Sequence, residues 1–262
     1  MVEEISICTP DRHFVEGSVY RCEQNVGFAL LVHGITADRH EWGFFDYLAR
    51  ELNEKGYTVL SIDYRGHGQS KMPIEKLSLS GVFIDIKAAW EWIEKECSNC
   101  SKNRVIIGNS FGGGLSYLFG QLCRSVDKVV MTCPVTSYIS DLSRVAEDWE
   151  AIPASSFIPY ASKKLPASIV TDMYAYDILI QTCPLIKETS VFHGTADSDV
   201  PFAESQQFVK DRCEIAQIYP LDGMDHSFSA PEGAPDQALL SPKYRLQAAQ
   251  VIAGVLAENQ LC

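Results

Sequence analysis

The stretch Val105-Ile106-Ile107-Gly108-Asn109-Ser110-Phe111-Gly112 decides the predicted fold. Three apolar residues lead into the pattern G-x-S-x-G, and a stretch suited to a helix follows at 113–118. Strand, sharp turn and helix are the context in which this pattern forms a nucleophile elbow. The glycines lack a Cβ, so strand and helix can approach closely. We therefore expect Ser110 at a strand end, with the N-terminus of the next helix directed at its hydroxyl group.

Length and composition predict one large α/β domain with an ordinary core, since 262 residues contain 46% hydrophobic residues. No run approaches about 20 apolar residues, so we expect no membrane span. The acidic start, Met1-Val2-Glu3-Glu4, lacks the features of a secretory signal, and we expect a cytoplasmic location. The net charge of −12 argues against a nucleic-acid partner. The oligomeric state does not follow from the sequence.

The nine cysteines are expected to be reduced thiols, many of them buried as small apolar groups. Cys97 and Cys100 form a C-x-x-C pair, which is typical of a zinc half-site or a redox pair. No second such pair and no paired histidines lie nearby, so we interpret both as incidental thiols. The sequence predicts no metal and no cofactor.

Short apolar runs alternate with longer amphipathic stretches along the chain. Runs that are apolar throughout are typical of parallel strands covered on both faces. The alternation predicts a doubly wound, mostly parallel α/β sheet with helices on both faces. We expect a strand at 13–23, further strands at 27–32, 57–62, 105–107, 126–132, 190–193 and 214–219, and helices at 44–55, 79–96, 115–123, 203–210 and 244–258.

Residues 134–184 interrupt this alternation. Prolines cut the segment into short pieces, and it is rich in aromatic residues, namely Trp149, Phe157, Tyr160, Tyr174 and Tyr176. A structureless loop of this length is improbable in a compact domain, so we expect a small helical insertion. We interpret it as a cap over the carboxyl ends of the strands, where open α/β sheets bind ligands. The core would then comprise 1–133 and 185–262, although helices that pack elsewhere are the alternative.

A serine nucleophile requires a base, an orienting acid and donors for an oxyanion. Among the six histidines, His226 follows the last predicted strand in a glycine-containing loop, from which it can fold back over the sheet edge. His33, His67 and His193 precede glycines at strand ends, where a structural role is the alternative. We therefore predict His226 as the base.

Two aspartates compete for the role of the acid in the segment His193–Pro201. Asp197 comes early in the turn, whereas Asp199 stands before Val200-Pro201, where it is suited to cap a helix. We predict Asp197 as the acid. Asp63 and Arg65, in the glycine-rich turn Asp63–Ser70, are expected to brace loops near the site; the turn lacks the Gly-Lys-Ser/Thr ending of a phosphate loop.

The oxyanion hole needs backbone N–H groups. The residue after the nucleophile, Phe111, should supply one, and the turn His33-Gly34-Ile35-Thr36 should supply the other. We choose Ile35 as the second donor. An ordinary strand-to-helix turn at 33–36 is compatible with this role.

The chain resembles the α/β-hydrolase superfamily over nearly its whole length. The resemblance rests on five motifs that occur in the order typical of the family: His33-Gly34, Asp63–Ser70, Gly108–Gly112, His193–Asp197 and Gly223–His226. It is greatest to small-capped serine esterases and lipases, such as monoacylglycerol lipases, feruloyl or cinnamoyl esterases and the serine aminopeptidase-like group. Asn109 stands where many relatives carry His.

The resemblance implies a serine hydrolase with the triad Ser110, Asp197 and His226, an acyl-serine intermediate and a small-molecule acyl ester as substrate. The aromatic residues of the insertion suggest an apolar or aromatic acyl or alcohol group. The same residues can cleave thioesters, amides or C–C bonds. A ligand-binding protein with a silent site is a further alternative.

Overall fold

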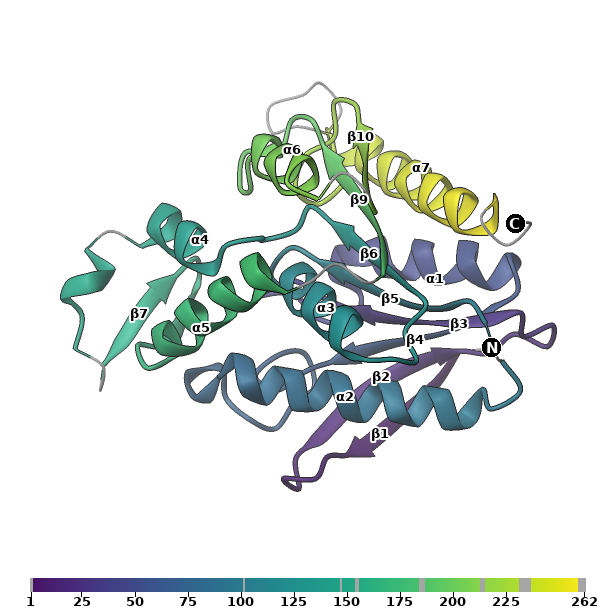
Figure 1. Ribbon diagram of the computed structural model, residues 1–262, viewed down its shortest axis with the longest axis horizontal. Coiled ribbons are helices and arrows are strands. Elements are labelled where there is room, and N and C mark those ends of the chain that lie inside the picture. Colours follow the sequence, from purple (N-terminus) through teal and green to yellow (C-terminus); the bar gives the residue numbers. More distant parts are fainter. Residues whose placement is uncertain are drawn as a thin grey trace.

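The computed structural model describes residues 2–100, 102–146, 148–153, 156–183, 187–212, 215–230 and 237–258. Its centre is an eight-stranded sheet with the spatial order β1-β2-β4-β3-β5-β6-β9-β10 (Figure 1). The six strands from β4 to β10 in this order are parallel, and β1 and β2 add an antiparallel edge. The strands are β1 (Val2–Cys8), β2 (Phe14–Tyr20), β3 (Gly27–Val32), β4 (Tyr57–Asp63), β5 (Arg104–Asn109), β6 (Lys128–Thr132), β9 (Glu188–Gly194) and β10 (Ala216–Leu221).

Helices cover both faces of this sheet. The strand β3 is fully buried and alternates between the two sides: Leu30 packs in the core with α2 and α3, and Leu31 packs in the core with α1 and α7. The predicted doubly wound, mostly parallel α/β architecture is therefore confirmed. The core helices are α1 (Phe44–Glu54), α2 (Leu79–Glu96), α3 (Phe111–Leu122), α6 (Phe202–Lys210) and α7 (Gln237–Glu258), with short 3-10 turns η1 (Glu41–Gly43) and η2 (Ile74–Lys76).

The insertion between β6 and β9 contains more than the predicted short helices. Its elements are α4 (Tyr138–Val145), the 3-10 turn η3 (Trp149–Ala151), β7 (Phe157–Tyr160), β8 (Lys163–Pro166) and α5 (Ile169–Thr182), and they extend to one side of the sheet (Figure 1). The antiparallel hairpin β7–β8 was not predicted. Only Ile158 and Tyr160 of β7 are buried, and Pro159 interrupts the run, so four residues give too short an alternation to detect.

Two other elements differ from the prediction. Strand β1 was not predicted. Only Ile7 in it is buried and Ile5 half-buried, so its sequence carries no strong apolar signal, yet it pairs with β2 along its whole length. Helix α7 begins at Gln237 rather than at 244 and contains Pro242. None of the helices in the described ranges is both long and apolar enough to cross a bilayer.

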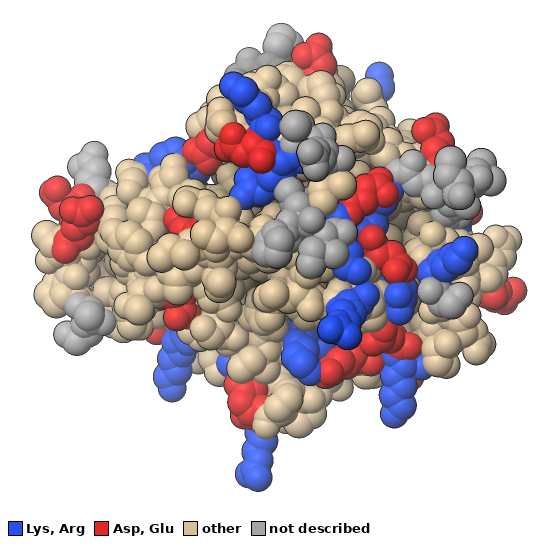
Figure 2. Space-filling model, in the orientation of Figure 1, with Lys and Arg blue, Asp and Glu red and all other residues tan. Residues whose placement is uncertain are grey.

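Charged residues are unevenly distributed on the face of the molecule in Figure 2. Lysine, arginine, aspartate and glutamate are interspersed over the core helices, whereas the region of α4 and α5 is mostly uncharged. Tyr174, Ile178 and Leu179 of α5 are exposed apolar side chains. The insertion therefore differs from the core in surface character as well as in architecture.

Candidate active site

Ser110 occupies the turn between β5 and α3 with a strained backbone, at φ 50° and ψ −120°. The two flanking glycines permit this turn. A Cβ on Gly108 would lie 2.4 Å from the carbonyl oxygen of Gly112, and one on Gly112 would lie 2.4 Å from the carbonyl oxygen of His33. The turn therefore has the geometry of a nucleophile elbow, as the sequence predicts.

The structure brings Ser110, His226 and Asp197 into one chain of hydrogen bonds. Nε2 of His226 lies 2.8 Å from Oγ of Ser110, and Nδ1 of His226 lies 2.7 Å from Oδ2 of Asp197. The three residues follow β5, β9 and β10, so their proximity results from the parallel strands ending at one edge of the sheet.

The hydrogen bonds of this chain shift the pKa values of its members. Burial alone would lower the pKa of His226, but the hydrogen bond and negative charge of Asp197 outweigh it and raise that pKa above its ordinary value. Burial alone would raise the pKa of Asp197, but hydrogen bonds from His193 and His226 hold it well below its ordinary range. Asp197 is thus an ionised carboxylate that favours the protonated imidazole of His226.

Backbone contacts distinguish Asp197 from its competitor Asp199. Oδ1 of Asp197 accepts hydrogen bonds from the N–H groups of Asp199 and Val200, both at 2.9 Å, which leaves Oδ2 for the histidines. Asp199 does not cap the following helix, because Pro201 holds the N-cap position of α6. Its exposed side chain faces the cavity beside Ser110 instead.

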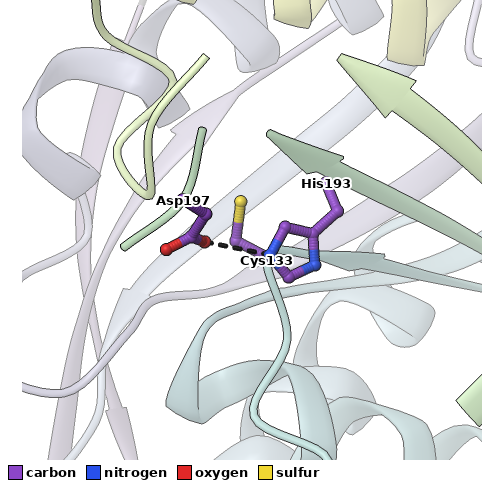
Figure 3. Close-up of side chains that lie close together, drawn as sticks. All are labelled: Cys133, His193 and Asp197. Atoms are coloured by element: carbon purple, nitrogen blue, oxygen red, sulfur yellow. Dashed lines mark hydrogen bonds and ion pairs between the residues drawn. The ribbon is translucent and has the colours of Figure 1, made fainter. Parts of the chain in front are cut away.

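Cys133, His193 and Asp197 form a buried cluster beneath the site (Figure 3). Nε2 of His193 lies 3.0 Å from Oδ2 of Asp197 and 3.0 Å from the carbonyl oxygen of Val200, so this nitrogen carries the proton. Nδ1 of His193 faces the hydroxyl group of Ser205 at 2.7 Å. Burial, followed by the charge of Asp197, raises the pKa of the Cys133 thiol. The residue types suit a metal ion, but both nitrogens are engaged and the thiol is neutral, so the cluster fits a support for Asp197 better.

The predicted oxyanion donors lie on the two loops that meet at Ser110. Phe111 is the first residue of α3, so its N–H has no acceptor within that helix. Gly34 packs against the serine so closely that a Cβ there would lie 3.0 Å from Cβ of Ser110. Ile35, which follows it, lines the same cavity as Ser110 and His226.

The loops around Ser110 are braced by buried ion pairs, as the sequence predicts for Asp63 and Arg65. Asp63 accepts hydrogen bonds from the N–H groups of Arg39 and Gln69, which ties the loop after β3 to the loop after β4. Arg65 pairs with buried Asp85 of α2 at 2.7 Å. These contacts fix both loops relative to the sheet.

A cavity of about 780 Å³ opens above Ser110, and we call it the Ser110 cavity. Of the five aromatic residues of the insertion, Tyr160 lines this cavity. Trp149 is buried in the core, Tyr176 is half-buried against it, and Phe157 and Tyr174 are exposed. Trp42, which no sequence motif contains, also lines the cavity and is 64% exposed. The other residues that line the Ser110 cavity include Gly34, Ile35, Glu41, Asp141, Arg144, Val145, Asp199, Val200, Asp225 and Ser227.

Glu41 is a second residue of the site that the sequence did not predict. It is buried, and its Oε2 accepts a hydrogen bond of 2.6 Å from the N–H of Gly34. No motif contains it, because a single glutamate between two strands carries no pattern. The contact with Gly34 and its place in the lining of the Ser110 cavity show that it belongs to the site.

The parallel sheet, the elbow at Ser110 and the helices on both faces define an α/β-hydrolase. The family profile described as serine aminopeptidase, S33, matches residues 23–189, and the chain belongs to this family. The AB hydrolase superfamily protein YisY of Bacillus subtilis (strain 168) is 29% identical over 89 residues, which is 33% of this chain and 31% of YisY. The match thus spans about a third of that relative. The chain is therefore a member of the α/β-hydrolase superfamily.

Several solved esterase structures share the fold. Est1E from Butyrivibrio proteoclasticus, solved with ferulic acid bound, has a TM-score of 0.77 and 18% identity, with 98% of each chain covered. The esterase domain of a Rhodothermus marinus protein has a TM-score of 0.73 and 14% identity, also with 98% of each chain covered. The Pyrococcus furiosus esterase Pf2001 has a TM-score of 0.70 and 16% identity, with 98% of this chain and 92% of that chain covered. At these identities the likeness concerns the fold.

Proposed function

We propose that the protein is a serine hydrolase that cleaves carboxylic esters of small molecules, with Ser110 as nucleophile, His226 as general base and Asp197 as the acid that orients it. The observation that carries the proposal is the continuous chain of hydrogen bonds from Ser110 Oγ through His226 to Asp197, at 2.8 and 2.7 Å. This is the arrangement that activates a serine hydroxyl group.

In the proposed first half-reaction Oγ of Ser110 attacks the acyl carbonyl carbon, and its proton passes to Nε2 of His226. The carbonyl oxygen becomes an oxyanion, which accepts hydrogen bonds from the N–H groups of Ile35 and Phe111. Each such donor contributes about 3 kcal/mol in comparable sites. His226 then returns the proton to the alcohol oxygen as the ester bond breaks, which leaves an acyl-serine.

In the second half-reaction water gives a proton to His226 and attacks the acyl carbonyl carbon. The acid leaves, and the proton returns to Oγ of Ser110. Asp197 holds Nδ1–H of His226 throughout, so Nε2 is always the nitrogen that exchanges the proton. No step calls on a metal or a cofactor.

We further propose that residues 134–184 act as a cap that forms part of the substrate pocket. Asp141, Arg144, Val145 and Tyr160 of this segment line the Ser110 cavity. Together with Trp42 and Ile35, the side chains of Val145 and Tyr160 offer apolar walls for an acyl or alcohol group. Arg144 pairs with Asp141 at 3.1 Å, so its charge is already balanced. An uncharged acyl or alcohol group of moderate size fits this part of the lining.

A second candidate reaction is the cleavage of N-terminal peptide bonds, which the family description, serine aminopeptidase, favours. Two structural neighbours support the ester over the peptide in our proposal, because the Rhodothermus marinus domain and Pf2001 are both esterases. Est1E, which binds ferulic acid, is consistent with a carboxylic acid product. Matched ester, thioester and aminoacyl anilide substrates would separate the reactions, because they differ in leaving group while the acyl group stays constant.

The decisive experiment combines active-site labelling with a panel of substrates. The wild-type protein should react with a fluorophosphonate probe and hydrolyse p-nitrophenyl and hydroxycinnamoyl esters of graded acyl size. Ser110→Ala should abolish labelling, and Ser110→Ala and His226→Ala should each remove nearly all hydrolysis, with little further loss in the double variant. A folded wild-type protein that neither labels nor cleaves any ester would refute the proposal in favour of a silent binding site.

A further inference from the structure

Glu41 has a left-handed backbone conformation, which residues other than glycine rarely adopt. Glu41 and Trp42 have φ values of 45° and 56°, and Gly43 follows with 88°. Such conformations cost free energy and persist only where the surroundings fix them. Glu41 is nevertheless 6% exposed, so a carboxyl group is buried at a strained position beside the elbow.

The contacts of Glu41 join the two loops that carry the predicted oxyanion donors. Its Oε2 accepts a hydrogen bond from the N–H of Gly34, which precedes Ile35. The side chain of Asn109, which precedes Ser110, also interacts with this carboxyl group and lowers its pKa. Since Oδ1 of Asn109 accepts from the hydroxyl group of Thr132 at 2.7 Å, the NH2 group of Asn109 is the donor left for Glu41. Asn109 thereby gains a role that its sequence position alone did not reveal.

We propose that Glu41 is a positioning residue that links Gly34 to Asn109, sets the spacing of the Ile35 and Phe111 N–H groups, and places a negative charge beside His226. This inference rests on the proposed function. It adds to the triad a group that touches neither Ser110 nor the reacting carbonyl in the steps above.

The charges around this group determine its electrostatic effect. Burial raises the pKa of Glu41 to about 7, against the hydrogen bond from Gly34 and the attraction of His226, which lower it. The ionised form in turn raises the pKa of His226. The groups that interact electrostatically with Glu41 are His226, Asp38, Tyr64 and Arg245, and those with His226 are Asp197, Asp199, Asp141 and Glu41. A charge at position 41 is thus one of several that favour the imidazolium.

Glu41→Gln separates the two contacts. The carbonyl oxygen of a glutamine can still accept from Gly34, but its NH2 group then meets the NH2 group of Asn109. We expect kcat to fall about tenfold with little change in KM. Glu41→Ala loses both contacts and should cost about 10²-fold in kcat, comparable to the loss of one oxyanion donor.

The pairing with Asn109 provides a rescue test. In Glu41→Gln/Asn109→Asp the donor and acceptor are exchanged, so the link is restored. In Asn109→Asp alone, the new carboxyl group at position 109 faces that of Glu41, and the two repel each other. The double variant should recover most of the kcat lost by Glu41→Gln and exceed Asn109→Asp. Equal or lower kcat in the double variant would contradict the link.

The pH profile provides a readout that a merely structural role would not move. Without the charge of Glu41, the imidazolium of His226 is less favoured, so the acid limb of kcat/KM in Glu41→Gln should move to lower pH. Glu54→Gln, at the exposed end of α1, is the matched control and should leave the limb in place. Circular dichroism and thermal unfolding verify that each variant is folded; if Glu41→Ala fails to fold, Glu41→Gln decides.

Two different failures can be told apart. An unchanged kcat and acid limb in folded Glu41→Gln, with wild-type protein that labels with fluorophosphonate, would overturn this inference alone. A wild-type protein that does not label would overturn the proposed function and this inference with it.

Discussion

Nε2 of His193 lies 3.0 Å from Oδ2 of Asp197, on the same oxygen that His226 contacts. Both histidines therefore donate to one atom, while two backbone N–H groups occupy the other oxygen, Oδ1. His193 is fully buried and is itself fixed by Ser205. His193 and the two backbone N–H groups thus hold the carboxylate of Asp197 in the position from which it orients the imidazole of His226.

Replacing His193 should weaken the site without touching the triad. His193→Phe removes a hydrogen bond to a buried charge, which should lower the free energy of unfolding by about 2 kcal/mol and reduce kcat. His193→Gln can retain an NH2 donor toward Asp197 and should lose less of both. Denaturant unfolding and steady-state kinetics measure the two effects, and equal losses in the two variants would contradict a donor role for His193.

Asp197→Asn should greatly reduce kcat, whereas Asp199→Asn should reduce it only slightly. The two backbone N–H groups at Oδ1 will select the carbonyl oxygen of an asparagine, so its NH2 group will face His226. That forces the wrong tautomer on the imidazole, a change worth about 10⁴-fold in kcat in serine hydrolases of this type. Steady-state kinetics on one ester measures both variants; a larger loss in Asp199→Asn would show that the acid was chosen wrongly.

The pH dependence of hydrolysis should reflect the raised pKa of His226. The base must be neutral to accept a proton, so kcat/KM should increase with pH through that pKa, with a midpoint above the ordinary 6.5. In Asp197→Asn the raising effect of Asp197 is lost, so the midpoint should move down. Profiles from about pH 5 to about pH 9 provide the measurement. A wild-type midpoint below 6.5 would mean that burial outweighs the pairing with Asp197.

A methyl group at Gly108 should damage the elbow. The new Cβ would lie 2.4 Å from the backbone oxygen of Gly112 and 2.4 Å from Oγ of Ser116, and the backbone cannot move without separating β5 from α3. We expect Gly108→Ala to lower the free energy of unfolding by about 3 kcal/mol and to reduce fluorophosphonate labelling.

Gly254→Ala is the matched control for this change, because nothing lies within 4 Å of a Cβ at that position of α7. It should stabilise the protein by about 0.5–1 kcal/mol, as expected in a helix interior. Both variants are compared by denaturant unfolding. If the two have similar effects, close packing does not explain the glycine at 108.

Much of the fold follows from local sequence. Strands β3 and β4 are buried at every position because both faces of the sheet are covered, and their mostly apolar runs are visible without the structure. The hairpin β7–β8 and the edge strand β1 are different, since each buries few side chains and owes its form to a neighbouring strand. A pattern in a single segment cannot report a partner that lies elsewhere in the chain.

Some features of the candidate active site likewise follow from local sequence, and others depend on the tertiary structure. The sequence by itself determined that Ser110 lies in a glycine-flanked turn between strand and helix, because steric exclusion at Gly108 and Gly112 is local. The sequence also predicted Asp197 as the acid and His226 as the base, because both follow recognisable strand ends. Only the tertiary structure decided that His193 contacts Asp197 and that the carboxyl group of Glu41 accepts a hydrogen bond from the N–H of Gly34. Those contacts join different elements, and hydrogen bonds between elements depend on how the strands and loops pack, which no single stretch of sequence encodes.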